Sequence, residues 1–241
     1  MNNPPPVLQV RVWRGAEDGA FQSFEVPRHE SQTVLDVVTY IQRDLDPTLS
    51  YRFACRVGMC GSCAMTVNGK ARWTCRTQVA SIAKNGAVDI APLENLPVIK
   101  DLVTDMAPFF DKWARAKGQF RGEHTRKDDF ARIQPESAQR KLVDEAIECI
   151  GCGVCYSACD VVRWNPEYLG PAALNRAWTL HNDGRDVMQT ERLSAVAGDA
   201  GCHACHTQMN CTERCPKHLS PTKSIAGLKR AALAAALKGR L

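Results

Sequence analysis

The feature that most constrains this chain is a run of four closely spaced cysteines, at Cys149, Cys152, Cys155 and Cys159. Their C-x2-C-x2-C-x3-C spacing is typical of proteins in which three thiolates hold one iron–sulfur cluster while the fourth reaches across to another. Because its fourth cysteine binds another cluster, such a run requires a second group of cysteines elsewhere in the chain. The sequence repeats the pattern further on with three cysteines, Cys205, Cys211 and Cys215, and has Gln208 where another cysteine would stand.

The crossing rule divides these seven cysteines into two sets of ligands. The four-ligand set predicts a [4Fe–4S] cluster held by Cys149, Cys152, Cys155 and Cys215. The other set predicts a [3Fe–4S] cluster, because it has three members, Cys159, Cys205 and Cys211. A zinc site is the alternative, but zinc does not require a third and a fourth cysteine at these spacings. Cys202 leaves a further alternative open, since it lies three residues before Cys205 and could supply a fourth thiolate.

A third set of cysteines lies in the first hundred residues, at Cys55, Cys60, Cys63 and Cys75. Its C-x4-C-x2-C…C spacing is that of plant-type [2Fe–2S] sites, and the alternative is four buried structural cysteines. Alternating apolar residues predict strands over 7–14 and 21–26, and the helical period predicts a helix near 34–41, capped by Ser31 or Thr33. Asn68-Gly69 predicts a hairpin that returns Cys75 to the loop carrying the first three ligands.

These patterns predict an α+β protein of two domains. Residues 1–104 form a β-grasp [2Fe–2S] domain, and residues 105–241 form a mostly α-helical domain with the other two clusters. Helices are expected over 108–117, 138–147, 171–180 and from 220 or 222 to 238.

Composition narrows the class of protein. Twelve cysteines with metal-type spacing, and no signal-peptide pattern in residues 1–6, favour a reducing compartment over a disulfide framework. No apolar run is long enough to span a membrane. The formal charge of +5 is offset by the negative clusters and their thiolates. Because no basic stripe with an aromatic platform is present, we expect no nucleic-acid partner.

The cysteine sets, in this order, resemble the iron–sulfur subunit of the succinate dehydrogenase/fumarate reductase family. The segments at 53–65, 97–103, 164–172 and 205–217 look like those that surround the family's clusters and join its domains. The resemblance implies an electron-transfer subunit of a succinate:quinone oxidoreductase, the respiratory complex II of the tricarboxylic acid cycle. Electrons would pass from FAD in a flavoprotein partner through [2Fe–2S], [4Fe–4S] and [3Fe–4S] to quinone at a membrane anchor, so no catalytic residue is expected here.

The resemblance also implies a quinone end and a location. Trp164 and His206 would offer ring N–H groups to a quinone oxygen. The subunit would be peripheral, held by anchor subunits on the cytoplasmic face of the inner membrane. The alternatives for the two side chains are a core aromatic and a hydrogen bond to a cluster ligand or water.

Several features depart from the family or leave alternatives. Asp160 stands where family members usually have Pro, Gln208 where they have an apolar residue, and Cys202 is an extra cysteine. Cys202 to His206 also fits a c-type haem attachment pattern, but Cys205 belongs to the stronger cluster pattern. The basic C-terminus could meet anionic lipid or be a solvated helix face. Alternative functions are a subunit of another flavin-linked, quinone-reducing dehydrogenase, or a free multi-cluster ferredoxin.

Overall fold

The computed structural model describes residues 6–241, which form two compact units. The N-terminal unit comprises the chain up to Met106 together with the later segment Ile150–Ala158. The C-terminal unit comprises Ala107–Cys149 and Cys159–Leu241. Residues 150–158, which the sequence analysis assigned to the second domain, group with the first because their contacts are there. The Glu94 N–H donates to Ser157 Oγ at 2.8 Å, and Asn95 Nδ2 donates to the Tyr156 and Ser157 carbonyls.

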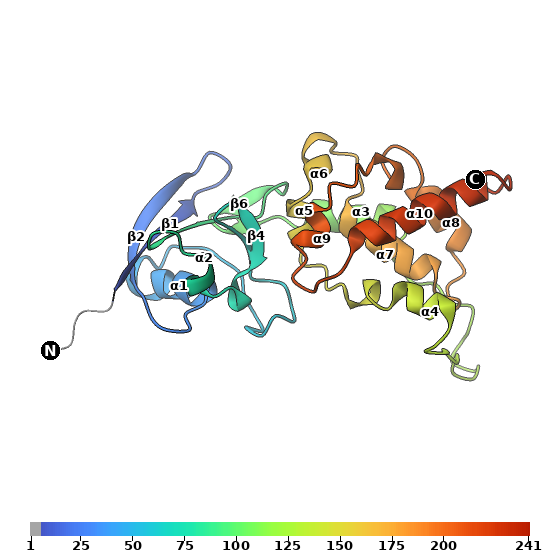
Figure 1. Ribbon diagram of the computed structural model, residues 1–241, viewed down its shortest axis with the longest axis horizontal. Coiled ribbons are helices and arrows are strands. Elements are labelled where there is room, and N and C mark those ends of the chain that lie inside the picture. The colour runs from blue at the N-terminus through green and yellow to red at the C-terminus, as the bar shows by residue number, and fades with distance from the viewer. Residues whose placement is uncertain (1–5) are drawn as a thin grey trace. The chain divides into compact units, whose positions relative to one another are not determined.

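A mixed five-stranded sheet forms the N-terminal unit (Figure 1). Its strands are β1 (Val7–Arg14), β2 (Ala20–Pro27), β3 (Ala64–Val67), β4 (Lys70–Trp73) and β5 (Ala87–Ala91), in the order β2-β1-β5-β3-β4. Only β1 and β5 run parallel. Asn68 and Gly69 both have positive φ, as the tight turn between β3 and β4 requires, so the predicted hairpin is confirmed.

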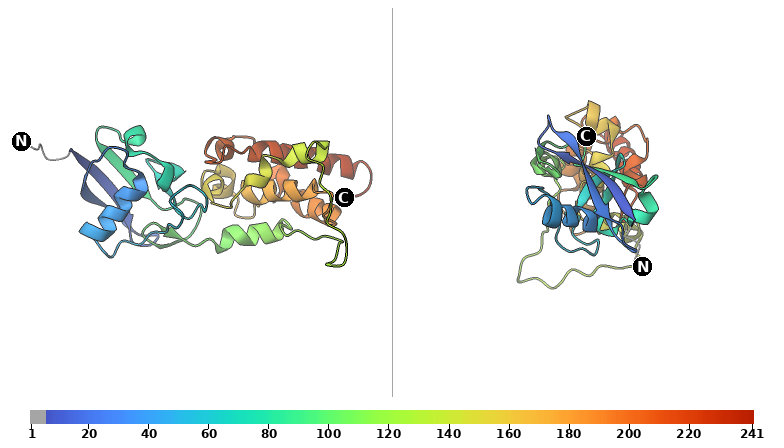
Figure 2. Two further views of the ribbon diagram at one scale, coloured as in Figure 1. Left: turned by 90° about the horizontal axis from the view of Figure 1, so that it is seen from below. Right: turned by 90° about the vertical axis from the view of Figure 1, so that its left-hand side faces the viewer.

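The helix α1 (Val34–Tyr40) lies across this sheet and continues as a π-helical turn, Ile41–Leu45 (Figure 2, left). Thr33 and Asp36 form a capping box, so Thr33 rather than Ser31 is the cap. The helix buries Val34, Val37 and Val38 against the inward side chains of β1, β3 and β5. Alternation along β1 is regular, since its even-numbered residues from 8 to 12 are buried and its odd-numbered residues from 7 to 11 exposed. This core fixes the open end of the β3–β4 hairpin, where two predicted ligands lie.

A second, two-stranded sheet was not predicted: β6 (Val98–Lys100) pairs with β7 (Val103–Thr104). Asp101, in the turn, has φ 53° and is 1% exposed. Its carboxylate accepts hydrogen bonds from Arg14 Nε at 3.2 Å, the Gly15 N–H at 2.8 Å and the Ser50 N–H at 2.8 Å. This segment therefore fastens the end of the N-terminal unit to residues far earlier in the chain.

The C-terminal unit is helical. Its α-helices are α3 (Ala107–Arg115), α4 (Ala138–Val143), α6 (Asp160–Trp164), α7 (Pro171–His181), α8 (Gln189–Val196), α9 (Asn210–Glu213) and α10 (Pro221–Ala236). Helix α7 is central, and α3, α8 and α10 contact it. The α7–α10 contact is close because Gly227 lies against the Trp178 ring. Asn175 on α7 donates to the Ala146 carbonyl at 3.0 Å and accepts from Ser224 Oγ at 2.8 Å. The α+β fold class is confirmed.

A buried ion pair in this unit joins α8 to the segment that precedes it. Arg192 on α8 and Asp186 are both fully buried, and two hydrogen bonds of 2.8 and 2.9 Å join their side chains. Arg192 also donates to the carbonyls of Lys117 and Gln119, which orders the chain after α3. Within residues 6–241, no helix is both long and apolar enough to cross a membrane.

Candidate metal centres

The first predicted ligand set lies around the open end of the β3–β4 hairpin. Cys63 directly precedes β3, and Cys75 lies in the 3₁₀ turn η2 (Thr74–Arg76) that follows β4. Thr74 joins the two strand ends, because its N–H and its hydroxyl both donate to the Cys63 carbonyl, at 3.2 and 2.8 Å. The structure thus brings Cys75 back to the 55–63 loop, as the hairpin predicted.

Backbone N–H groups of the 55–63 loop point at sulfur. The N–H groups of Met59 and Cys60 donate to Cys55 Sγ at 3.2 and 3.3 Å. Donation from Met59, Val57 and Cys60 lowers the pKa of the Cys55 thiol to about 6. The loop can curl in this way because Gly58 and Gly61 adopt φ of 75° and 72°. Donors aimed at sulfur are what a [2Fe–2S] cluster needs, so the residues present fit it.

The pKa of the Cys75 thiol shifts in the opposite direction to that of Cys55. Burial, together with the neighbouring Cys63, raises the pKa of the Cys75 thiol to about 11. A thiol in this environment ionises at neutral pH only when a metal displaces its proton. The set therefore combines a partly exposed Cys55, stabilised as a thiolate, with a buried thiol that depends on metal.

The run from 149 to 159 crosses from one unit to the other. Cys152 and Cys155 belong to the N-terminal unit, whereas Cys149 and Cys215 belong to the C-terminal unit, so this predicted four-ligand set is divided. Within the N-terminal unit, Cys152 packs against the 55–63 loop. A Cβ added at Gly61 would lie 2.5 Å from the Cys152 Cβ, so only glycine fits there. Two predicted cluster-binding segments are therefore in direct contact.

The three-cysteine set lies wholly in the C-terminal unit, where Cys159, Cys205 and Cys211 line one small hollow. Cys159 is the N-cap of α6, and Cys211 lies in the first turn of α9. A hydrogen bond of 3.0 Å from Asn210 Nδ2 to Asp160 Oδ2 joins these two segments. Burial raises the pKa of Cys159 to about 11 and also raises that of Cys211.

The donor set of this hollow fits a three-iron cluster. Gln208 lines the hollow where the spacing would place a fourth thiolate, and its amide is a poor ligand for iron. Cys202 is fully buried and is not among the lining residues. The loop between the ligands is strained, since Thr207 and Met209 both have positive φ. The Thr207 N–H nonetheless donates to Cys205 Sγ at 3.4 Å.

The side chains that the resemblance assigned to the quinone end lie next to each other. The rings of Trp164 and His206 meet edge to face with centroids 6.2 Å apart. Both are exposed, Trp164 to 57%, so the first is not a core aromatic. Within residues 6–241, no three His, Cys, Asp or Glu side chains converge on a single metal ion. The ligands of a cluster need not converge on one ion, because they are shared among two or more irons.

Sequence reasoning missed two side chains of this hollow, Tyr168 and Thr222. Thr222 was considered only as a possible start of α10, but Ser220 caps that helix by accepting from the Lys223 N–H, and Thr222 contacts Cys211 instead. Neither residue lies at a motif spacing from a cysteine, so no signal in the sequence would have identified them.

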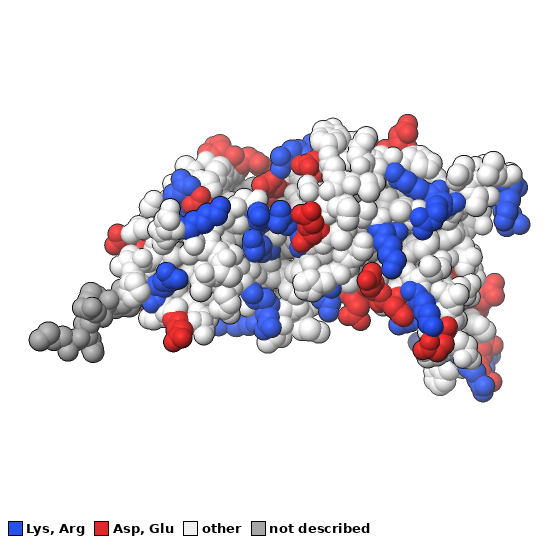
Figure 3. Space-filling model, viewed as in Figure 1, with Lys and Arg blue, Asp and Glu red and all other residues white. Residues whose placement is uncertain are grey.

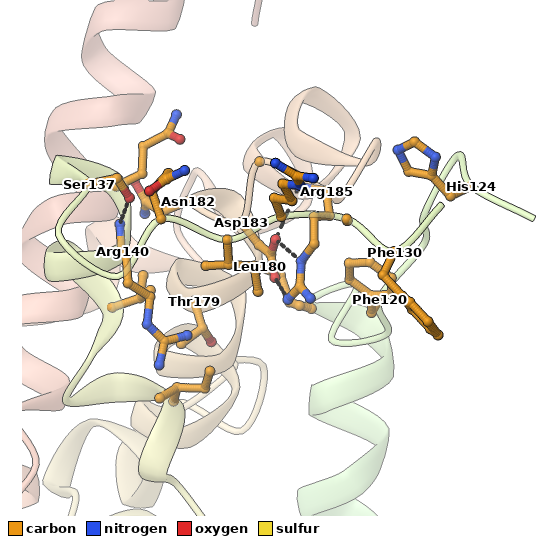
Figure 4. A pocket seen from close by; sticks show the side chains of 18 of the residues that line it. Phe120, His124, Phe130, Ser137, Arg140, Thr179, Leu180, Asn182, Asp183 and Arg185 are labelled. Carbon is orange, nitrogen blue, oxygen red and sulfur yellow. Dashed lines mark hydrogen bonds and ion pairs between the residues drawn. The ribbon is translucent and has the colours of Figure 1, made fainter. Parts of the chain in front are cut away.

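A larger pocket of about 860 Å³ lies elsewhere in the C-terminal unit, between the 120–140 segment and the end of α7 (Figure 4). None of the predicted cluster ligands lines it. Arg185 in its wall is paired with Asp183 at 2.6 Å and stacks over the Phe120 ring, so its charge is already balanced. We assign this pocket no part in the cluster chemistry.

Fold and site together define an iron–sulfur protein with several clusters. Residues 8–111 match the family of 2Fe-2S iron-sulfur cluster binding domains, and residues 145–219 match the 4Fe-4S dicluster domain. The chain belongs to the iron–sulfur subunits of succinate dehydrogenases and fumarate reductases.

The relatives that show this span most of the chain. The fumarate reductase iron-sulfur subunit of Haemophilus influenzae is 34% identical over 91% of this chain and 91% of its own length. The succinate dehydrogenase iron-sulfur subunit of Paracoccus denitrificans is 41% identical over 81% of this chain and 74% of its own. A chain of the Mycobacterium smegmatis Sdh1 complex in the apo form superposes with a TM-score of 0.85 at 28% identity, over 95% of this chain and 97% of that one. The family expected from the sequence is confirmed.

Proposed function

We propose that this subunit relays electrons from FAD of a flavoprotein partner through [2Fe–2S], [4Fe–4S] and [3Fe–4S] clusters to quinone at a membrane anchor. The contact of Cys152 with Gly61 carries the proposal, because it brings the segments of the first two clusters together within one unit. Substrate chemistry, the oxidation of succinate or the reduction of fumarate, would take place on the flavoprotein. The established family and its two cluster-binding domains support this division of labour.

The proposed ligands follow the cysteine sets. The [2Fe–2S] cluster would be held by Cys55, Cys60, Cys63 and Cys75. The [4Fe–4S] cluster would be held by Cys149, Cys152, Cys155 and Cys215. The [3Fe–4S] cluster would be held by Cys159, Cys205 and Cys211. The N–H groups aimed at Cys55 and the absence of a fourth thiol among the residues lining the last hollow support the first and third assignments.

A peripheral position at the membrane, on the cytoplasmic face, is also part of the proposal. Basic side chains lie along α10 and at the C-terminal end (Figure 3), and no Asp or Glu follows position 213. One exposed face of α10 carries Arg230 and Leu233, with Leu237, Lys238 and Arg240 just beyond the helix. Leucines flanked by basic residues suit an anionic lipid surface next to an anchor.

The decisive experiment is purification from host membranes, followed by EPR spectroscopy and two activity assays. We expect a flavoprotein and a hydrophobic anchor to co-purify, succinate to reduce the clusters, and the oxidised complex to show a three-iron signal. Isolation as a lone chain would favour a free ferredoxin. Clusters that are reduced by another substrate but not by succinate would favour a different flavin-linked dehydrogenase.

The quinone end is tested by Trp164→Phe and His206→Ala. Because both rings are exposed side by side beside the Cys205 segment, we expect slower quinone reduction. Succinate oxidation with an artificial acceptor on the flavin side should be unchanged. An equal loss in both assays would mean that these side chains support the fold, and the quinone assignment would then be wrong.

A further inference from the structure

Besides its three thiols, the [3Fe–4S] hollow has hydroxyl groups in its wall. Tyr168 is 1% exposed and lies in the turn between α6 and α7, which is fixed by its own N–H to the Asn165 carbonyl at 3.1 Å and by the Leu169 N–H to the Ala200 carbonyl at 2.8 Å. It lines the hollow together with the three cysteines, and Cys205 is the thiol to which its hydroxyl would donate. Because a tyrosine phenol ordinarily ionises only near pH 10, this hydroxyl carries its proton at neutral pH and can donate it.

Thr222 approaches a different thiol from α10. Its Oγ1 lies 3.5 Å from Cys211 Sγ and 2.9 Å from Thr212 Oγ1. When Cys211 binds iron its sulfur has no proton, so Thr222 must be the donor to it. Thr212 must then donate to Thr222 Oγ1, while the Thr222 N–H donates to Thr212 Oγ1 at 3.4 Å. The donor and the acceptor of each of these hydrogen bonds are therefore fixed, and each bond strengthens the donor of the next one.

Donors of this kind favour the reduced cluster. An added electron makes the ligating sulfurs more negative, and a hydrogen bond to a charged acceptor is stronger than one to a neutral acceptor. Tyr168 and Cys211 are buried, so water does not readily replace a donor lost on their side of the hollow. Hydrogen bonds to cluster sulfurs are one of the factors that set the reduction potential.

We infer that the hydroxyls of Tyr168 and Thr222 raise the reduction potential of the cluster held by Cys159, Cys205 and Cys211. The inference rests on the proposed function, because it assumes a three-iron cluster at this site. Tyr168 and Thr222 are positioning residues with respect to the electron transfer, since they act through the ligands.

The test is a redox titration of the purified complex, followed by the EPR signal of the oxidised three-iron cluster. Tyr168→Phe and Thr222→Val each keep the shape of the side chain and remove the hydroxyl. We expect each to lower the equilibrium constant for reduction of this cluster by about three- to tenfold, and tenfold is about 59 mV for one electron. The double variant should lie lower than either single one, because the two hydroxyls address different thiols.

Two matched controls complete the experiment. Thr222→Ser keeps the hydroxyl, and Tyr51→Phe removes a tyrosine hydroxyl in the N-terminal unit, where it donates to Thr39 Oγ1 at 3.2 Å. Both should leave the potential unchanged. An unchanged potential in Tyr168→Phe and Thr222→Val at full signal intensity would overturn the inference and leave the proposed function intact. If Tyr168→Phe fails to retain the cluster, the test is the comparison of Thr222→Val with Thr222→Ser, and equal potentials in these two variants would overturn the inference. A wild-type complex without the signal would contradict the cluster assignment itself.

Discussion

At the residue scale, we predict that Gln208 decides how many irons the last site holds. It lines the hollow of the three cysteines but offers only a neutral amide, whereas iron in these clusters takes thiolate. We predict that Gln208→Cys completes a four-iron cluster. The EPR signal of the oxidised protein should disappear, the potential should fall because the added thiolate is negative, and quinone reduction should slow.

Cys202→Ser is the control for this change. Cys202 is fully buried in the turn η4 (Cys202–Ala204), and burial raises the pKa of its thiol. Because it does not line the hollow, the variant should keep the three-iron signal. A signal that appears only in Cys202→Ser would identify Cys202 as the fourth ligand and contradict the prediction.

At the element scale, the Arg192–Asp186 pair holds α8 against the chain that follows α3. Burial alone would raise the pKa of Asp186, but hydrogen bonds from Arg192 and from the Arg121 and Met188 N–H groups lower it overall. A folded-state pKa below the unfolded value of about 3.9 means that the pair adds stability above that pH. This contribution is lost as the pH falls through the folded-state pKa.

We therefore predict that Arg192→Met lowers the free energy of unfolding by about 3–5 kcal/mol at pH 7, because it leaves a buried carboxylate without its partner. The deficit should shrink as the pH falls toward 4 and below, because the unpaired buried carboxylate of the variant can then be protonated. Denaturant titrations at several pH values measure this. Arg185→Met breaks a partly exposed pair with Asp183 and should cost at most about 1 kcal/mol. Equal effects of the two variants at every pH would contradict the argument.

The α7–α10 contact gives a second prediction at this scale. Replacing glycine by alanine inside a helix ordinarily adds about 1 kcal/mol of stability. At Gly227, however, the new Cβ would lie 2.6 to 2.8 Å from atoms of the Trp178 ring, and overpacking costs about 1–3 kcal/mol. The ring cannot easily move, because its N–H donates to the Leu142 carbonyl at 3.2 Å.

Gly227→Ala should therefore lower the thermal unfolding midpoint of the complex. The additional change Trp178→Phe removes part of the clashing ring and should restore some of the loss. A midpoint above that of the wild type would show that helix propensity outweighs packing at this position.

At this scale, the sequence predicted the elements that depend on residues close together in the chain. The hairpin at Asn68-Gly69, the helix after Thr33 and the helix that begins at Pro171 were recognised, because turn chemistry, capping and periodicity act over a few residues. The β6–β7 sheet and α8 were missed. The β6–β7 turn depends on Asp101, whose partners Arg14 and Ser50 lie far away in the sequence.

The same limit applies to the site. Cysteine spacing predicted three ligand sets, because loops around a cluster are short and their spacing is nearly fixed. The hydroxyls of Tyr168 and Thr222 were not predictable, since the turn before α7 and the first turn of α10 meet the ligands only in the folded unit.

At the scale of the whole molecule, residues 150–158 belong with a unit whose main part ends more than forty residues earlier. Ser157 is buried, and its hydroxyl accepts from the Glu94 N–H. We predict that Ser157→Ala destabilises the N-terminal unit by about 0.5–1.5 kcal/mol, because it removes the acceptor of this part-buried hydrogen bond. Hydrogen exchange of the β5 amides should become faster.

Ser81→Ala is the matched control, since Ser81 is exposed and its hydroxyl donates only locally, to the Gln78 carbonyl at 2.8 Å. Its effect should stay within about 0.5 kcal/mol. Unchanged exchange in β5 of Ser157→Ala would show that the 150–158 segment is dispensable for the N-terminal unit.

The division of the chain also bears on how the protein is made. Domains usually fold in the order in which they leave the ribosome, at about 5–20 residues per second. Here the N-terminal unit cannot be completed when Met106 emerges, because its last segment ends at Ala158. At those rates the nascent chain waits roughly 3–10 s longer, with the 55–63 loop lacking the Cys152 segment that packs on Gly61. The arrival of that segment does not cover the thiols themselves, since Cys60 is exposed and Cys55 half-buried in the complete unit, so the cell must protect this loop from oxidants and the wrong metal until its cluster is loaded.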